Sequence, residues 1–365
     1  MHAKLEAIPG SSQRPLRRTA AIVVVLGCWG CCCLAGAAQD DDWVNYKQSY
    51  VSPKGRVIDT GHAGVSHSEG QGIGLLLAAH NKDHAAFDSI WQWTRINLQI
   101  RSDKLSAWKW VPSGIADEIG SGKVTDRNNA TDGDIFIAWA LYRAGRQWND
   151  TAYLQAGTEI SRDIRSKLMG QSAHGPVLLP GEQGFVKAGA VTINLSYWVF
   201  PALQDLNRLD PAPDWEKLIA SGLTLLQSGR FGRWQLPSDW LRLADKPEIA
   251  PDFKPRFSYD AVRIPLYLIW AKLDSPDNLK PFNAFWGYFQ FARFVPAWTA
   301  LADDSVDSYD APPGIKAVIS LTRLKGSVQT RQNKLQLPKL IPGQDYYSAT
   351  LLLLTKLAAQ ESAAR

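Results

Sequence analysis

The sequence predicts an all-α protein, and three observations lead to this fold class. Apolar residues recur with the period of an α-helix in about ten segments, and no segment shows the strong alternation of a half-buried strand. The segments are similar in length, and Gly-, Pro- and Asp-rich connections join them. We expect helices at residues 69–80, 83–99, 133–146, 151–168, 194–208, 213–228, 261–273, 280–294, 313–324 and 345–359. The periodicity does not distinguish a closed ring of helical hairpins from an α-solenoid.

The first 38 residues have the pattern of an export signal. Arg14, Arg17 and Arg18 form a basic region, an apolar run covers residues 20–37, and small residues end the run. We predict a signal peptide at 1–38 and a single domain at 39–365, located in the periplasm or secreted. An uncleaved membrane anchor is the alternative, because the run is nearly as long as the ~20 residues that a spanning helix needs.

The composition of the remaining chain excludes several classes of protein. All four cysteines lie in the leader, so residues 39–365 have neither a disulfide nor a thiolate metal site. The formal net charge of the whole chain is +5. Without the leader's Lys4, Glu6, Arg14, Arg17 and Arg18 it is about +2, which excludes a nucleic-acid footprint. Tryptophan occurs 15 times, and we expect several of these rings to line a groove and stack on sugars.

Connections between the expected helices differ in length. Residues 50–61 predict a short hairpin around Pro53-Lys54-Gly55. Residues 170–190 and 229–255 form long connections that would gather on one face of a helical toroid. No stretch has the composition of a flexible linker, which favours one domain.

The first candidate site residue is Glu69. The segment SHSEGQGIG, residues 66–74, places this carboxylate at a helix start among three glycines spaced by two. Glycine inside a helix costs roughly 1 kcal/mol, so the absence of side chains suggests that a bulky ligand approaches the backbone beside Glu69. The alternative is structural, with an acid favoured by the helix dipole and glycines that admit a neighbouring helix.

Two aspartates lie at the start of the helix expected at 133–146. Thr131, Asp132 or Asp134 can each cap this helix, so capping is the simpler explanation for the cluster. Two acids exceed the need of one cap. We therefore assign Asp132 to a site and Asp134 to the helix end.

A third acid, Asp260, begins the segment DAVRIP. Asp260 and Arg263 stand three residues apart, so on a helix they share a face and can pair. A nearby cation lowers the pKa of a carboxyl, which makes Asp260 a candidate general base. A structural surface ion pair is the alternative.

Aromatic residues in loops are the candidate sugar-binding surfaces. Trp108 and Trp110 lie in a loop with polar surroundings, whereas the aromatic run from Phe282 has helical spacing and is interpreted as core. His80 and His84 stand four apart but lack the glutamate and third ligand of a zinc site, so we interpret them as a solvated helix end. The predicted substrate-binding residues are Asn194, Tyr197, Trp108, Trp110, Trp234, Tyr259 and Arg263.

These motifs together resemble glycoside hydrolase family 8, most closely the endoglucanases associated with bacterial cellulose synthesis. Residues 130–148, ATDGDIFIAWALYRAGRQW, fit the family signature at every constrained position. SEGQGIG from Ser68, INLSYW from Ile193 and SYDAVRIP from Ser258 follow in the family's order. The resemblance covers essentially the whole chain after the leader. Leu195 departs from it, since relatives often have proline after the asparagine.

The resemblance implies an (α/α)6 barrel, a toroid of six helical hairpins with a few short strands in its loops. It implies an inverting endo-1,4-β-glucanase in which Glu69 is the proton donor and Asp260 activates water. Arg263 and Tyr259 would assist the base, and Asp132 would hold the distorted sugar. Inversion requires carboxyl groups about 6.5–9.5 Å apart, with Glu69 protonated in the drier setting.

The same resemblance implies a β-1,4-glucan chain as substrate, no metal or cofactor, and an association with a cellulose synthesis and export complex. We expect a monomer. Three alternatives remain: a non-catalytic glucan-binding subunit, a family member that acts on xylan or mixed-linkage glucan, and a lyase. The near-neutral charge gives no support to a lyase for acidic sugars.

Overall fold

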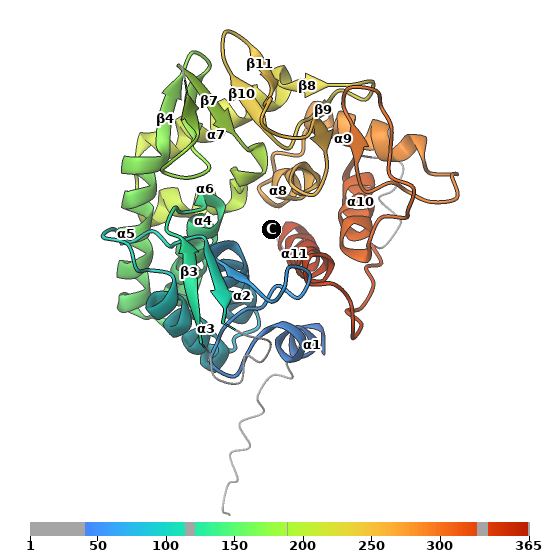
Figure 1. Ribbon diagram of the computed structural model, residues 1–365. Helices are drawn as coiled ribbons and strands as arrows, with labels where there is room; N and C mark the ends of the chain where they lie inside the picture. Colours follow the sequence, from blue (N-terminus) through green and yellow to red (C-terminus); the bar gives the residue numbers. More distant parts are fainter. Residues whose placement is uncertain (1–40, 114–120, 188, 327–334, 364–365) are drawn as a thin grey trace, which may run out of the picture. The chain divides into compact units, whose positions relative to one another are not determined.

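Helices account for most of the regular structure, and they form two layers (Figure 1). The computed structural model describes residues 41–113, 121–187, 189–326 and 335–363, all within one compact unit, residues 39–365. The predicted leader lies outside the described residues. Among the described residues, no helix has both the length and the apolar character that crossing a membrane requires.

The inner layer is a ring of six helices. Along the ring α2 contacts α4, α4 contacts α6, and α6 contacts α8; α10 and α11 follow, and α11 returns to α2. These helices are buried on most sides, and all seven residues of α8 are buried. Their bounds are α2 Ser68–His80, α4 Thr131–Trp148, α6 Phe200–Leu209, α8 Ile264–Trp270, α10 Pro313–Gly326 and α11 Tyr346–Ala363.

The outer helices each cover part of this ring and bury only one face. α3 packs on α2, α5 on α4, α7 on α6, α9 on α8 and α10, and α1 on α11. Helix α5, for example, buries Tyr153, Ile160, Ile164 and Leu168 and leaves its other face to solvent. The outer bounds are α1 Asp41–Tyr50, α3 His84–Asn97, α5 Thr151–Leu168, α7 Pro213–Ser228 and α9 Pro276–Tyr288.

Short strands occupy the connections that precede several inner helices. β1 (Ser66–His67), β2 (Lys109–Pro112) and β3 (Gly122–Asp126) form one antiparallel sheet, and β1 leads directly into α2. The two long connections supply a four-stranded sheet in the order β11-β10-β7-β6, formed by Pro247–Ile249, Leu241–Leu243, Ala190–Ile193 and Val186–Lys187. Two-stranded pairs complete the set: β4 Met169–Ser172 with β5 Gly175–Leu178, β8 Arg230–Phe231 with β9 Leu236–Pro237, and β12 Arg256–Phe257 with β13 Thr299–Ala300. The predicted (α/α)6 barrel with a few short strands is confirmed.

The glycines near Glu69 admit other parts of the protein. A Cβ on Gly72 would lie 2.6 Å from the Cβ of Phe136 on α4, and one on Gly133 would lie 2.6 Å from the backbone nitrogen of Glu69. Of the other two glycines in the motif, a Cβ on Gly70 would lie 2.6 Å from the hydroxyl of Tyr346 and one on Gly74 would lie 2.8 Å from Cγ2 of Val57. The structural alternative for the three glycines after Glu69 is therefore correct, and the prediction that they admit a ligand is wrong. Their consequence for the site is that the starts of α2 and α4 lie in contact.

Some expected elements differ from those observed. Helix α1 was not predicted, although Trp43, Tyr46 and Tyr50 give it a buried face. The segment expected at 194–208 divides into a short 3-10 helix, η2 (Leu195–Tyr197), and α6. Helix α9 ends at Tyr288, and Phe291 beyond it is 92% exposed, so this part of the aromatic run is not core. At residues 50–61 the predicted hairpin is reduced to a turn with one bridge between Val51 and Val57.

Candidate active site

A pocket with a volume of about 410 Å³ opens where several inner helices begin. Helices α2 and α4 and the 3-10 helix η3 (Ala261–Arg263), which leads into α8, have their first residues at this pocket. Helix N-termini carry partial positive charge, so carboxylates are favoured there. The lining includes Glu69, Asp132, Asp260, Arg263, Trp108, Tyr197, Tyr259, Asp59, His62, His67, Tyr346 and Tyr347.

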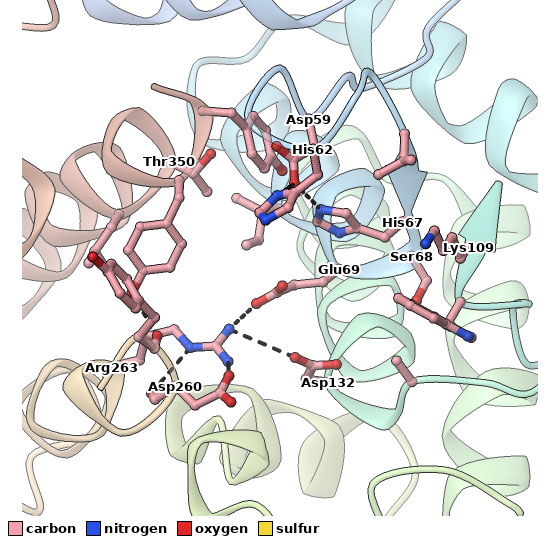
Figure 2. Close-up of a pocket in the computed structure, with 18 of the residues that line it drawn as sticks. Asp59, His62, His67, Ser68, Glu69, Lys109, Asp132, Asp260, Arg263 and Thr350 are labelled. Atoms are coloured by element: carbon pink, nitrogen blue, oxygen red, sulfur yellow. Dashed lines mark hydrogen bonds and ion pairs between the residues drawn. The ribbon is translucent and has the colours of Figure 1, made fainter. Parts of the chain in front are cut away.

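Arg263 is the centre of this arrangement (Figure 2). One of its terminal nitrogens, Nη1, donates a hydrogen bond to Glu69 and lies 3.8 Å from Oδ2 of Asp132. The other, Nη2, donates to Oδ1 of Asp260 at 2.8 Å and to Oγ of Ser196 at 3.0 Å. The structure therefore brings together the three predicted acids around one buried guanidinium.

Burial and mutual repulsion determine how these carboxyls ionise. Burial, together with the negative charge of Glu69, raises the pKa of Asp132 well above its usual value, and Arg263 only partly opposes this. Burial also raises the pKa of Asp260, although the charge of Arg263 acts in the opposite direction. The predicted pairing of Asp260 with Arg263 is present, but the predicted lowering of the Asp260 pKa is wrong because burial has the larger effect.

Asp132 has the driest environment of the three acids. Its side chain is 4% exposed, against 26% for Glu69 and 32% for Asp260. The prediction compared Glu69 with Asp260, and of these two carboxyls Glu69 is slightly the less exposed. Asp132 is also held by its own helix, because Oδ1 accepts the N–H of Gly133 at 2.8 Å.

Glu69 lies in the first turn of α2, and His67 caps this helix. Nδ1 of His67 accepts the N–H of Gly70 at 3.0 Å, and Nε2 lies 3.4 Å from Oδ2 of Asp59. Asp59 also pairs with His62 at 2.8 Å. Burial raises the pKa of Asp59, but the hydrogen bonds from His67 and His62 outweigh it and hold that pKa at about 2.

Asp134 does not cap the helix as predicted. Its Oδ1 accepts the N–H of Ser106 at 2.7 Å, and its Oδ2 accepts Nδ2 of Asn129 at 3.0 Å. The carboxyl is fully buried, and burial raises its pKa to about 7. Asp134 therefore ties two connections to α4 and supports the position of Asp132 indirectly.

Asn194 and Ser196 connect η2 to the site. Oδ1 of Asn194 accepts the N–H of Ser196 at 3.0 Å and its hydroxyl at 2.7 Å, and the Ser196 oxygen in turn accepts Arg263. Asn194 is fully buried and does not line the pocket. It reaches the site through Ser196 and through an interaction with the Asp260 carboxyl that acts to lower its pKa, whereas the sequence predicted a direct contact with substrate.

The predicted aromatic platforms fall into two groups. Trp108, Tyr197 and Tyr259 line the pocket, and Nε1 of Trp108 donates to Asp126 at 2.8 Å, which fixes its ring. Trp110 is only 2% exposed because it packs against Trp93 beneath Arg56. The prediction of Trp110 as a sugar platform is therefore wrong.

Trp234 is also a buried residue. It is 9% exposed, packs against Phe285 and Phe289, and does not line the pocket. The ring of Trp240 stacks with the rings of Phe185 and Phe253. Trp234 therefore offers no free face to a sugar ring, whereas Trp240 is only partly buried.

Several pocket residues were missed from the sequence. Tyr346 and Tyr347 stand together at the start of α11, where a helix start beside two tyrosines was a usable signal. The hydroxyl of Tyr347 donates to the backbone oxygen of Tyr259 at 2.7 Å. Asp59 and His62 carried no local signal, because only the fold brings their loop to the pocket.

Comparisons with known proteins identify the family. The model for "Glycosyl hydrolases family 8" matches residues 18–361. A probable endoglucanase from Novacetimonas hansenii is 41% identical over 322 residues, which cover 87% of this chain and 90% of that protein. An endoglucanase from Cellulomonas uda is 35% identical, with 84% of this chain and 83% of that protein covered. The solved structure of an endo-β-1,4-glucanase from Acetobacter xylinum has a TM-score of 0.81 and 40% identity, covering 88% of this chain and 98% of that one.

Fold, site and sequence thus define a carbohydrate-cleaving enzyme of the helical-toroid class. The chain belongs to glycoside hydrolase family 8.

Proposed function

We propose that this enzyme is an endo-1,4-β-glucanase that hydrolyses cellulose-type glucan with inversion of configuration. The observation that carries the proposal is the cluster of Glu69, Asp132 and Asp260 around Arg263 in a pocket lined by aromatic rings. Relatives that match most of the chain bear the name endoglucanase, which supports β-1,4-glucan as the substrate.

Glu69 is the proposed general acid. Three carboxylates face one guanidinium, so full ionisation would leave uncompensated negative charge in a buried site. The raised pKa values of Asp132 and Asp260 favour retention of a proton in the cluster. As the general acid, Glu69 delivers a proton to the glycosidic oxygen as the bond to the anomeric carbon breaks.

Asp260 is the proposed general base. It removes a proton from a water molecule as the water oxygen bonds to the anomeric carbon. The glycosidic bond breaks, its electron pair stays on the leaving oxygen, and Glu69 protonates that oxygen. Arg263 holds the Asp260 carboxylate at 2.8 Å and so fixes the direction from which water attacks.

Asp132 is proposed to bind the sugar at the cleavage point. Its carboxyl is fixed by Gly133, so it offers its second oxygen, Oδ2, to a sugar hydroxyl. Trp108, Tyr197 and Tyr259 are proposed to contact the adjacent rings, because flat apolar faces stack on sugars.

The test is reducing-end release from soluble carboxymethylcellulose by residues 39–365. Glu69→Gln and Asp260→Asn should each lower kcat about 100- to 10,000-fold, because each removes one proton-transfer group. Glu159→Gln is the matched control, since Glu159 lies on the outer helix α5 and pairs with Lys104. It should retain wild-type activity.

Three outcomes would contradict parts of the proposal. Full activity of Glu69→Gln would show that Glu69 is not the general acid. A folded wild-type protein that binds glucan but cleaves neither carboxymethylcellulose, mixed-linkage glucan nor xylan would be a non-catalytic glucan-binding subunit. Faster cleavage of xylan or mixed-linkage glucan than of cellulose oligosaccharides would show that the faster substrate, and not cellulose, is the preferred one.

We further propose that residues 1–38 are a cleaved signal peptide and that the exported domain is a monomer serving cellulose synthesis. The basic and apolar pattern of the leader supports export. The intact mass of protein recovered from periplasm and medium should correspond to a chain starting near Gln39. Recovery of the full-length chain in the membrane fraction would show an anchor instead, and light scattering would detect an oligomer.

A further inference from the structure

The position of Asp260 in its helix poses a local problem. Asp260 immediately precedes η3, where the first backbone N–H groups of a helix lack partners and an aspartate side chain normally accepts one. The side chain of Asp260 makes no such bond. Its Oδ1 accepts Nη2 of Arg263 instead. Another group must therefore satisfy the backbone at this point.

Asp239 supplies that group from a different segment. Its Oδ1 accepts the N–H of Ala261 at 2.9 Å and the N–H of Ser258 at 2.8 Å. Its Oδ2 accepts the hydroxyl of Ser258. A single carboxylate thus holds the chain two residues before Asp260 and one residue after it.

Asp239 is itself buried and fixed in place. It is 8% exposed, and its backbone N–H donates to the oxygen of Arg256 at 2.8 Å. Leu236 and Leu241, on the strands to either side, are fully buried. Asp239 does not line the pocket that holds Glu69, Asp132 and Asp260.

An acid is an unfavourable choice for a purely structural cap here. Burial and the negative charge of Asp260 raise the pKa of Asp239 to about 7, so the carboxyl is disfavoured as an anion. Asp239 therefore lies close enough to Asp260 for the charge of one carboxyl to affect the other.

We propose that Asp239 is a positioning residue for the general base, and this inference rests on the proposed role of Asp260. By capping η3 in place of Asp260, Asp239 leaves the Asp260 carboxylate free to face Arg263 and the attacking water. It also fixes the backbone on both sides, which sets the direction of that carboxylate.

The test compares variants that separate geometry from charge. Asp239→Asn keeps an oxygen for both N–H groups and removes the charge, so its kcat on carboxymethylcellulose should stay near the wild-type value. Asp239→Glu keeps the charge but misplaces the oxygens. Asp239→Ala removes them. Both should lower kcat about 100-fold, because small displacements of a reacting group have effects of this size, with KM within about threefold.

A matched control tests for general destabilisation. Asp83 is also 8% exposed and caps α3 through Ala86, beyond the end of α2 that lies away from Glu69. Asp83→Ala should lower the melting temperature and leave kcat of the folded protein unchanged. If Asp239→Ala does not fold, the ranking of Asp239→Asn above Asp239→Glu still decides the question.

The contrary results are specific. Wild-type kcat in folded Asp239→Glu and Asp239→Ala would overturn the positioning role. A lower kcat for Asp239→Asn than for Asp239→Glu would show that charge, and not geometry, matters. Failure of the proposed function itself is recognised separately, because Asp260→Asn would then remain active or the wild type would be inactive.

Discussion

At the start of α2 the helix is capped from within its own segment, whereas at the start of η3 the cap comes from a distant loop. His67 lies two residues before Glu69 and accepts the N–H of Gly70. Asp239 lies more than twenty residues before Ala261 and accepts its N–H across the structure. In both places the proposed catalytic carboxylate is left free for Arg263. The base therefore depends on tertiary structure for its position, and the acid depends mainly on local structure.

Asp132 shows the opposite arrangement. Its carboxylate accepts the N–H of the next residue in its own helix, Gly133, and it is nearly inaccessible. An acid held in this way suits the binding of a sugar hydroxyl better than proton transfer, since its oxygens are already directed. The three acids at three helix starts thus differ in what holds each carboxyl and the backbone beside it.

The largest effect should follow from removing Arg263, which contacts both the proposed acid and the proposed base. Arg263→Ala leaves three carboxyls without their cation, so kcat should fall at least about 1,000-fold and stability by about 3–5 kcal/mol. Initial rates and urea unfolding measure both effects. The control is Arg143→Ala, because Arg143 forms a bidentate pair with Glu361 near the far end of α4. It should lower stability alone; a kcat as low as that of Arg263→Ala would contradict the distinction.

A smaller effect is expected from removing the cap of α2, the helix that carries the proposed acid Glu69. His67→Asn keeps a capping oxygen at the start of α2, whereas His67→Ala loses the cap and about 1 kcal/mol of stability. Because the local backbone continues to hold Glu69, kcat of His67→Ala should fall less than that of Asp239→Ala. The ratio of the two kcat values, measured on one substrate, tests whether Asp260 depends more on the Asp239 cap than Glu69 depends on the His67 cap. A greater loss in His67→Ala would reverse the comparison.

The smallest effects concern how stability changes with pH. The contributions of Asp239 and Asp59 should change in opposite directions as the pH rises. The pKa of Asp239 is raised from 3.8 to about 7, so the folded state keeps a proton that the unfolded chain releases. This stabilisation is complete below pH 3.8 and is lost as pH rises through about 7. The pKa of Asp59 is lowered to about 2, so its stabilisation is present above pH 3.8 and is lost as pH falls.

Urea unfolding midpoints measured at acidic, mildly acidic and alkaline pH, all within the range where the protein is folded, measure these contributions. Asp239→Asn should flatten the decline on the alkaline side, and Asp59→Asn should flatten the decline on the acidic side. Identical pH profiles for the wild type and both variants would show that neither carboxyl is perturbed in the folded protein.

The proposed acids and most of the helices could be predicted from the sequence because both are encoded by local patterns. The helical period survives in the inner and outer layers, and Glu69, Asp132 and Asp260 each stand at a helix start within a recognisable motif. Asp59 and Asp239 were not predicted, because their contacts join segments that only the fold brings together.

The tryptophans illustrate the same limit. Trp108 and Trp110 are separated by one residue, so regular alternation along an extended segment would direct both rings to the same face. A register shift between Lys109 and Trp110 interrupts the alternation, and Trp108 lines the pocket while Trp110 is buried. Composition and loop context are the same for both residues. Only the pairing of β2 with β1 and β3 decides which ring is buried.

The most direct test of the proposed mechanism is the anomeric configuration of the first product. Cello-oligosaccharide hydrolysis by residues 39–365, followed by proton NMR before mutarotation, should show the α-anomer appearing first, since Asp260 directs water to the face opposite the leaving group. Initial formation of the β-anomer would mean retention, and Asp260 would then not act as a base on water.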